Sequence, residues 1–591
     1  MTESSAYSQS ARAGRSIVVL LGVLAAAASL PAGTASHFDI IEHNGEITAI
    51  KPVEELDLPA RWFFEPDTAG EAPYRVRIAG EAFPLVAAGF IEPAYYARFQ
   101  IKEPFTLEIE VDLPEDYTTN LQPKRYREDL SGSEGALRLE INEPGPRVFM
   151  MESADGGRRV PLIVLAEPYR SWEVAGPGLF LDVSAAAEAD SLETETLQEA
   201  MDTVAAAEDG GVVYFGPGVY HTRQLRVGPN TRVFLAPGAV VYADTDYDGR
   251  HRPLFLFDEA DNSGLTGPGV IDGRGHIIRG DAPGRAPASF HLVRFQNGRN
   301  MYASDVVLRN SSAWTFHIVG CDRVQVDGVR VLADWGVRHT DGIDPDNVRD
   351  VEIANVFVYS GDDALCVKTT DRYGSDARPT RNVTMRDSVV MSLKTPLKVG
   401  TESSADIENI LFENIDVIHS ARGLGVWMRD GTRFNNITFR SIRIDALEFE
   451  GESMSGEAIR FCIQHRLPGG SIKNIVVEDV SVSAPYRAIF TGREGSRFSN
   501  IILRDIDWKV TPTRIKTPPE PVTLGWVTDR ENELPIEGRP LVAIHRVNNL
   551  LAENVAIDWS KAPDSWDRFL DKQESTNIDL KGVTHEGYPF H

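Results

Sequence analysis

The sequence predicts an all-β protein in which an N-terminal β-sandwich precedes a right-handed parallel β-helix. Two patterns support this: the C-terminal region repeats short β-branched runs every 26 to 28 residues, and the N-terminal region alternates polar and apolar residues between Pro, Gly and Asp clusters. A chain of 591 residues also exceeds one ordinary core. We expect the sandwich domain over residues 37–185 and the β-helix domain over residues 186–591.

A secretory signal peptide is expected over residues 1–36. Arg12 and Arg15 precede an apolar run at residues 17–30, and a small-residue stretch follows at residues 31–36. The apolar part is too short to span a bilayer comfortably, and the order of charged, apolar and small residues is that of a signal peptide. We therefore predict a secreted or periplasmic protein without membrane insertion.

The sandwich is predicted from short alternating strands. Examples are Thr106-Leu-Glu-Ile-Glu-Val-Asp112 and Leu137-Arg-Leu-Glu-Ile-Asn142. After this region, Leu197, Met201 and Val204 recur at helical spacing within residues 193–204. We expect one amphipathic helix there, placed to cover the open end of the β-helix.

The β-helix is predicted from asparagine–aliphatic dipeptides that open successive β-rich runs. They are Asn382-Val383, Asn409-Ile410, Asn436-Ile437, Asn474-Ile475, Asn500-Ile501, Asn549-Leu550 and Asn577-Ile578. The commonest spacing is about one supersecondary unit, which is typical of a solenoid. Asparagine tolerates positive φ and suits corners, so we interpret these residues as structural. Two longer intervals indicate loops that leave the coil and could shape a binding groove.

Charge and cysteine content exclude several classes of function. The 87 acidic and 60 basic residues give a formal charge of -27, which repels phosphate backbones and makes nucleic acid an unsuitable partner. The same charge disfavours a polyanionic substrate unless a local basic patch overrides it. Cys321, Cys366 and Cys462 lack metal-ligand spacing and are interpreted as buried core residues. We expect no metal and no cofactor.

Three aspartates form the candidate catalytic site. Asp341 and Asp362 are 21 residues apart, close to one repeat, so we predict that they lie on neighbouring coils about 4.8 Å apart. Two carboxylates stacked in this way can flank a glycosidic oxygen and a water, as acid–base glycoside hydrolysis requires. Asp363 can join them only if the backbone bends, which Gly361 permits. An Asp–Asp pair alone is commonly a solvated turn, but its position one repeat after Asp341 favours a site.

Four ordered motifs surround these aspartates. They are Thr266-Gly-Pro-Gly-Val-Ile-Asp-Gly-Arg-Gly275, Trp314-Thr-Phe-His-Ile-Val319, Thr340-Asp-Gly-Ile-Asp-Pro345 and Gly361-Asp-Asp-Ala364. Together they resemble the motifs of glycoside hydrolase family 28, the polygalacturonases, over about residues 190–510. The resemblance implies that Asp362 is the general acid and that Asp341 and Asp363 position and deprotonate water. It implies single displacement with inversion.

Two departures from the family pattern concern the substrate. Lys394 stands where the family has the histidine of Gly-His-Gly, and Gly425 and Trp427 stand where it has Arg-x-Lys. Sugar C–H faces stack on Trp, so we expect a neutral or modified glycan and predict that plain galacturonan is a poor substrate. Lys394 and Lys398 are the residues that could rescue binding of galacturonate.

Six residues are expected to contact the substrate or support the aspartates. They are His339, Asp344, Lys368, Lys394, Lys398 and Trp427. Asp344 is interpreted as a turn or supporting residue that could share the base role.

A sandwich ahead of a β-helix also resembles glycoside hydrolase family 49, the dextranases and isopullulanase. We therefore predict a secreted hydrolase of a polysaccharide, dextranase-like in substrate, with a polygalacturonase as the alternative. A β-helix lyase, with Lys368 or Lys394 as base, and a glycan-binding protein without activity are alternatives of other classes.

Overall fold

A computed structural model describes residues 72–112, 117–133, 135–153, 159–169, 178–187, 192–246, 252–279, 289–372, 376–446, 456–464, 467–512, 538–561 and 567–586, with single positions 172, 174, 534 and 536. Further N-terminal it gives the backbone of four short strands: β1 (Val18–Leu20), β2 (Ile41–His43), β3 (Glu46–Thr48) and β4 (Ala60–Trp62). Apart from β1, the predicted signal peptide lies outside the described residues. No helix in the described part is long and apolar enough to cross a membrane.

The N-terminal domain is a β-sandwich, as predicted. One sheet has the order β10-β13-β14-β8-β4 with β7 on β8, and the other has the order β11-β12-β9-β5-β6. Their strands, with one 3-10 helix, are β5 (Tyr74–Ile78), β6 (Glu81–Phe83), β7 (Val86–Gly89), β8 (Ala94–Ile101), β9 (Phe105–Val111), β10 (Tyr117–Gln122), η1 (Lys124–Asp129), β11 (Leu130–Ser133), β12 (Ala136–Ile141), β13 (Gly145–Ser153) and β14 (Arg159–Pro168). Alternate side chains such as Leu107 and Ile109 face Phe99 and Leu162 in one apolar core, which is why the strands alternate in polarity.

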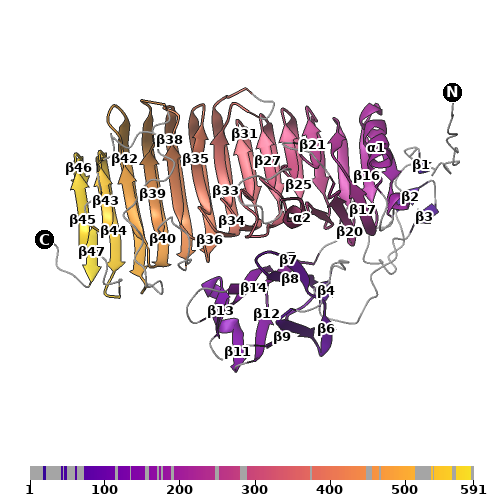
Figure 1. Ribbon diagram of the computed structural model, residues 1–591, viewed down its shortest axis with the longest axis horizontal. Helices are drawn as coiled ribbons and strands as arrows, with labels where there is room; N and C mark the ends of the chain where they lie inside the picture. The colour runs from indigo at the N-terminus through magenta and orange to yellow at the C-terminus, as the bar shows by residue number, and fades with distance from the viewer. Residues whose placement is uncertain are drawn as a thin grey trace, which may run out of the picture.

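Strands β2 and β3 form a separate two-stranded sheet. The strands from β15 onward, with β1, form the right-handed parallel β-helix, whose coils are stacked along the long axis in Figure 1. A 12-stranded sheet forms one wall: β18 (Leu225–Val227), β21 (Phe255–Asp258), β24 (Val293–Gln296), β27 (Phe316–Val319), β30 (Ile343–Asp346), β33 (Leu365–Thr369), β35 (Leu397–Ser403), β37 (Leu424–Met428), β39 (Glu457–Ile463), β41 (Arg487–Thr491), β43 (Pro540–His545) and β45 (Arg568–Gln573).

A 22-stranded sheet, which includes β1, forms the other walls. Its remaining strands are β15 (Leu179–Asp182), β16 (Gly211–Phe215), β17 (Gly218–Thr222), β19 (Thr231–Leu235), β20 (Ala239–Ala243), β22 (Gly264–Thr266), β23 (Val270–Asp272), β25 (Arg299–Ser304), β26 (Val307–Arg309), β28 (Asp322–Asp327), β29 (Arg330–Leu332), β31 (Arg349–Ala354), β32 (Phe357–Ser360), β34 (Thr380–Ser392), β36 (Ile407–Ile418), β38 (Arg433–Asp445), β40 (Ser471–Ala484), β42 (Arg497–Val510), β44 (Asn548–Asp558), β46 (Thr576–Asp579) and β47 (Val583–Glu586).

The repeated asparagines lie at corners of the coils, as predicted. Asn382, Asn409 and Asn436 have φ of 57°, 59° and 58°. Their side chains form a ladder, because Asn409 Nδ2 donates to Asn382 Oδ1 at 3.0 Å and Asn436 Nδ2 donates to Asn409 Oδ1 at 2.9 Å. Asparagine is used here because it combines the left-handed backbone with hydrogen bonds between coils.

The expected helix is α1 (Thr194–Ala206), and it stands at the N-terminal end of the coils (Figure 1). Leu197, Met201 and Val204 are buried in the apolar core of the β-helix, so the helix covers the open end as predicted. The other helices are short: α2 (Gly275–Arg279) and the 3-10 helix η2 (Ser184–Ala186). All three cysteines are buried and free, which also agrees with the prediction.

The sandwich packs against the 22-stranded sheet through an apolar interface. Tyr96 and Ile163 of the sandwich join Phe357 and Tyr359 of the β-helix in one buried cluster. Strand β15 precedes the boundary predicted between residues 185 and 186, yet it pairs in parallel with β16 of the β-helix. The exact domain boundary stays a prediction.

Asp334 connects the sandwich to the chain segment that leads into the candidate site. Its carboxylate accepts backbone N–H bonds from Phe90 at 2.7 Å, Ile91 at 2.8 Å and Glu92 at 3.2 Å. It also accepts the N–H of Gly336 at 2.9 Å, and the Asp334 side chain is fully buried. The turn of the sandwich therefore depends on one carboxylate of the β-helix.

We expect Asp334→Ala to lower the free energy of unfolding by about 3 kcal/mol or more, because it leaves several buried N–H groups without an acceptor. Urea denaturation measures this. Asp327→Ala is the control, since Asp327 is exposed and accepts one side-chain bond from Asn355; it should cost less than about 1 kcal/mol. Equal losses in the two variants would contradict the role of Asp334.

Candidate active site

The three predicted catalytic aspartates lie together on neighbouring coils. Asp341 and Asp363 each stand two residues before a strand of the 12-stranded sheet, β30 and β33, which pair Ile343 with Leu365. The N–H of Gly342 donates to the carbonyl of Asp363 at 2.9 Å, which fixes the two turns against each other. One carboxylate oxygen from each of Asp341, Asp362 and Asp363 lies within 4.8 Å of the others. We call these three residues the aspartate trio.

The backbone turn before Asp362 is tightly held at Gly361. A Cβ at Gly361 would stand 2.6 Å from Thr340 Oγ1 and 2.9 Å from the carbonyl of Val337, so a side chain does not fit. The Gly361 N–H donates to Thr340 Oγ1 at 3.1 Å. The carbonyl of Asp362 accepts two hydroxyls, from Ser360 at 2.9 Å and Ser392 at 2.5 Å. The backbone bend predicted at Gly361 is therefore present.

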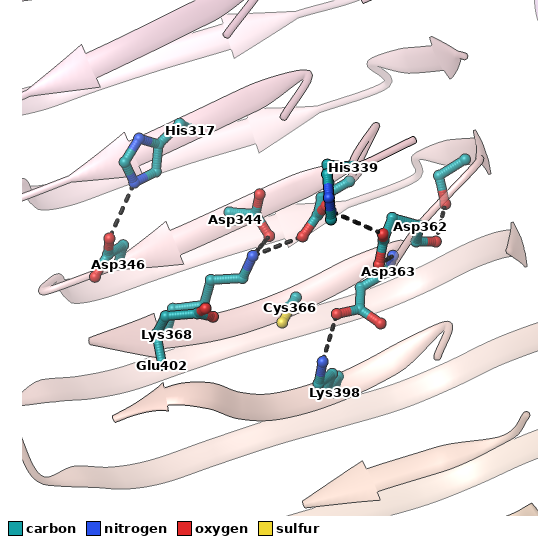
Figure 2. A network of polar contacts seen from close by, with 12 residues as sticks. His317, His339, Asp344, Asp346, Asp362, Asp363, Cys366, Lys368, Lys398 and Glu402 are labelled. Atoms are coloured by element: carbon teal, nitrogen blue, oxygen red, sulfur yellow. Dashed lines mark hydrogen bonds and ion pairs between the residues drawn. The ribbon is translucent and has the colours of Figure 1, made fainter. Parts of the chain in front are cut away.

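Lys368 neutralises one side of the trio. Its buried ammonium lies 2.6 Å from Asp341 Oδ2 and 3.2 Å from Asp344 Oδ1, and Figure 2 shows it pointing toward Asp344. The contact with Asp344 is an ion pair without hydrogen-bond geometry, because neither oxygen of Asp344 makes a hydrogen bond within the described residues. The Lys368 ammonium also lies 3.5 Å from the ring centre of Trp314, a cation–π distance.

Lys398 neutralises the other side. Its ammonium donates to Asp363 Oδ2 at 2.6 Å, as Figure 2 shows, and Asp363 Oδ1 accepts the N–H of Thr395 at 3.1 Å. The same ammonium lies 4.5 Å from the ring centre of Trp427. Asp363 is thus held in one orientation by a cation and a backbone donor.

Asp362 is the most accessible member of the trio. Its side chain is 20% exposed, against 4% for Asp341 and 6% for Asp363. His339 Nδ1 lies 3.5 Å from Asp362 Oδ2 (Figure 2), and the His339 side chain is 67% exposed. Lys394 is half-buried and close enough to act on the charge of Asp362. A sugar oxygen arriving from solvent therefore meets Asp362 first.

The environments separate the pKa values of Asp341 and Asp362. Burial raises the pKa of Asp341 to about 7, while Lys368 opposes it and Asp362 and Asp363 add to it. Burial also raises the pKa of Asp344 well above its usual range, against the opposing charge of Lys368. For Asp362 burial acts upward as well, but the hydrogen bond from His339 and the charge of Lys398 outweigh it, so its pKa is lowered.

In the unliganded protein Asp341 therefore takes up a proton more readily than Asp362. The family resemblance assigns the acid role to Asp362. With that assignment, Asp362 must carry the proton when substrate is bound, so substrate binding has to shift the proton from Asp341 to Asp362. Three clustered carboxylate oxygens could also attract a cation, but the ammonium groups of Lys368 and Lys398 already supply positive charge there.

The structure differs from the sequence analysis at Trp427, which was expected to replace a lost charge clamp by an aromatic surface. Trp427 is buried, and two guanidinium carbons lie near its ring centre, Arg460 at 4.8 Å and Arg422 at 5.4 Å. Sequence reasoning gave neither arginine a role. The interval from Lys398 to Gly425 is one repeat, 27 residues, but a loop lengthens the interval from Gly425 to Arg460 to 35, so spacing alone did not align Arg460 with this coil.

A family model described as "Glycosyl hydrolases family 28" matches residues 231–520, which include the trio and both neutralising lysines. Over these residues the β-helix resembles glycoside hydrolase family 28. The chain is 24% identical to a "Probable polygalacturonase" of Vitis vinifera over 355 residues, 53% of this chain and 72% of the relative. The family resemblance is confirmed, and the protein is a glycoside hydrolase.

Two solved structures complete the comparison. A family 28 exopolygalacturonase of Yersinia enterocolitica has a TM-score of 0.52 at 15% identity, covering 88% of this chain and 100% of that chain. This likeness shows the β-helix fold. Dex49A from Penicillium minioluteum has a TM-score of 0.42 at 13% identity, covering 92% of this chain and 97% of that chain.

Proposed function

We propose that this enzyme hydrolyses glycosidic bonds of a galacturonate-containing polysaccharide by single displacement with inversion. The aspartate trio, with its oxygens within 4.8 Å of one another, is the observation that carries the proposal. Asp362 protonates the leaving oxygen, because it is the accessible member. Asp341 and Asp363 hold and deprotonate the attacking water.

The lysines favour water over a covalent intermediate. Asp341 and Asp363 each have one oxygen bonded to an ammonium at 2.6 Å and are almost fully buried. A carboxylate held in this way has one free oxygen with which to orient a water, and it is poorly placed to move toward an anomeric carbon. The close spacing of the trio also suits the shorter carboxylate separation of retaining enzymes, so the configuration of the product is the discriminating measurement.

An acidic substrate is preferred over the neutral glycan that the motif departures predict. The prediction of a neutral glycan depended on the absence of cations at positions 425 and 427. In the structure, however, the cationic groups of Lys398, Arg422 and Arg460 lie near the ring of Trp427. The Vitis vinifera relative, whose name is polygalacturonase, supports the same choice. Secretion belongs to this proposal, because a polysaccharide of this kind is met outside the cell and residues 1–36 are predicted to be a signal peptide.

The expected result is cleavage of galacturonan oligomers with inversion of the anomeric carbon. Proton NMR of the first turnover products reads the configuration before mutarotation, and dextran oligomers of matched length serve as the neutral comparison. A retained anomer would mean that one aspartate is a nucleophile. Cleavage of dextran alone would restore the neutral-glycan alternative.

A further inference from the structure

The turn between β7 and β8 of the sandwich reaches the chain segment that leads into the aspartate trio. In Figure 1 these strands lie on the side of the sandwich nearest the β-helix, close to α2. Three backbone N–H groups of this turn, at residues 90–92, donate to the carboxylate of Asp334. Ile91 also packs on Gly336, because a Cβ there would stand 2.3 Å from Ile91 Cγ2. The two domains are therefore in direct contact just before the site.

Three hydrogen bonds connect Asp334 to the turn that carries the candidate acid. The Val337 N–H donates to the carbonyl of Asp334 at 3.0 Å, and the Thr340 hydroxyl donates to the carbonyl of Val337 at 2.9 Å. Thr340 Oγ1 in turn accepts the N–H of Gly361 at 3.1 Å. Thr340 is fully buried, so water does not compete for these bonds. We call residues 334–340 the connecting segment.

The connecting segment also sets the position of His339. The φ of His339 is 60°, a left-handed conformation that a residue with a side chain keeps only where its neighbours hold it. Thr340 on one side is fixed by the bonds just described. The carbonyl of Arg338 on the other side accepts a hydrogen bond from Arg279. With its backbone held at both ends, His339 places Nδ1 3.5 Å from Asp362 Oδ2.

A second contact of the sandwich turn acts through α2. The ring of Phe90 stacks on His276, with the ring centres 4.0 Å apart. Arg279, three residues further along this helix, donates to the carbonyl of Ser312 at 2.9 Å and to the carbonyl of Arg338. The sandwich turn therefore contacts both the connecting segment and the helix whose arginine holds that segment.

The contact between His339 and Asp362 changes the pKa of both groups. Burial acts to raise the pKa of Asp362, but the hydrogen bond from His339 and the charge of Lys398 outweigh it. The same hydrogen bond raises the pKa of His339 above its ordinary value, while burial and the charge of Arg279 oppose the change. The titration of His339 therefore reports whether its imidazole is in place.

We propose that residues 90–92 of the sandwich are a positioning element of the active site, which holds His339 against Asp362 through the connecting segment. This inference rests on the proposed function, in which Asp362 is the acid. It gives the N-terminal domain a part in the reaction that requires no contact between that domain and the polysaccharide. A sandwich that is only attached to the β-helix would have no influence on Asp362.

NMR titration of the full chain with ring-labelled histidine tests the position of His339 independently of activity, and His339→Gln identifies its signal. Asp334→Asn keeps the shape of the side chain, but its amide NH₂ faces two of the N–H groups that the carboxylate accepted. Ile91→Ala keeps those N–H groups and removes the contact with Gly336. In both variants the pKa of His339 should fall by about 0.5 or more toward its ordinary value.

Kinetics test the consequence for the acid. Asp334→Asn should lower kcat on galacturonan oligomers at least about tenfold and change KM less than about twofold, because protonation of the leaving oxygen is impaired. An aryl glycoside with a good leaving group should lose less than about threefold. In a His339→Gln background Asp334→Asn should cost less than about twofold more, since both changes interrupt the same route.

Leu139→Ala is the matched control, because Leu139 is buried in the core of the sandwich on β12, in the sheet opposite the interface. It should lower the melting temperature and leave the titration of His339 and the kinetics of the folded enzyme unchanged. An unmoved titration in Asp334→Asn and Ile91→Ala, or an equal shift in Leu139→Ala, would overturn the positioning role. Equal kinetic losses on both substrates would do the same. If Asp334→Asn does not fold, Ile91→Ala decides by the same readouts.

The two proposals fail in different ways. A shifted titration of His339 in these variants of an enzyme that hydrolyses no polysaccharide would overturn the hydrolytic function and keep the positioning role. Hydrolysis of galacturonan that is unaffected by Asp334→Asn, with the titration unmoved, would keep the function and overturn the positioning role.

Discussion

Asp362→Asn is expected to lower turnover on the natural polysaccharide at least about a thousandfold while the fold stays intact. The substitution removes the proton donor for the leaving oxygen and preserves side-chain volume. The carbonyl of Asp362 accepts the hydroxyls of Ser360 and Ser392, and its Oδ1 accepts the N–H of Asp363 at 3.0 Å, a bond that the Oδ1 of asparagine can also accept. Thermal unfolding and steady-state kinetics measure the two effects.

A change of leaving group separates the acid from the base. An aryl glycoside with a good leaving group needs little protonation, so Asp362→Asn should recover most of its rate on that substrate and Asp341→Asn should not. The opposite pattern would assign the acid role to Asp341, whose pKa burial raises to about 7. Asp479→Asn is the control, since Asp479 is exposed on β40 and its carboxylate accepts a hydrogen bond from the Ser441 hydroxyl; it should leave the rate unchanged.

Lys368→Met is expected to lower kcat/KM at pH 6 at least about a hundredfold, with partial recovery as the pH rises. Lys368 lowers the pKa of Asp341, which burial has raised to about 7. Its removal raises that pKa further, so less Asp341 is ionised and able to take a proton from water. The acid limb of the pH–rate profile should therefore move to higher pH.

The same substitution changes the dependence of stability on pH. The pKa of folded Asp341 lies above its unfolded value of 3.8, so the folded state binds more protons and ionisation of Asp341 costs stability as the pH rises from about 4 to about 7. Without Lys368 this cost grows and extends to higher pH, because Asp344 also loses its partner. We expect a loss of about 3–5 kcal/mol near neutral pH and a smaller loss near pH 4.

Lys509→Met is the control, since Lys509 is an exposed lysine of β42 on the other sheet. It should leave the pH–rate profile in place. A Lys368→Met enzyme with an unshifted acid limb would show that Asp341 does not act as the base. Urea denaturation at several pH values gives the stability change independently of activity.

The sequence by itself determined the architecture and the trio. Repeats such as Asn382, Asn409 and Asn436 define the coil, because a corner in left-handed backbone favours asparagine wherever it occurs. The alternation of polar and apolar residues around Leu107 likewise predicts, from local sequence alone, a strand with one face in the core of the sandwich. Asp341 and Asp362 could be placed together because one uninterrupted repeat separates them, so spacing along the chain translates directly into distance between coils.

Only the tertiary structure showed which cations pair with these carboxylates and which side chains lie on the neighbouring coils. The pairing of Lys368 with Asp341 and of Lys398 with Asp363 depends on side-chain direction across coils, which repeat spacing does not give. Arg460 could not be aligned with Lys398 from the sequence, because an inserted loop lengthens the repeat before its strand. Burial raises the pKa of Asp341, and burial is a property of the packed molecule, not of the order of its residues.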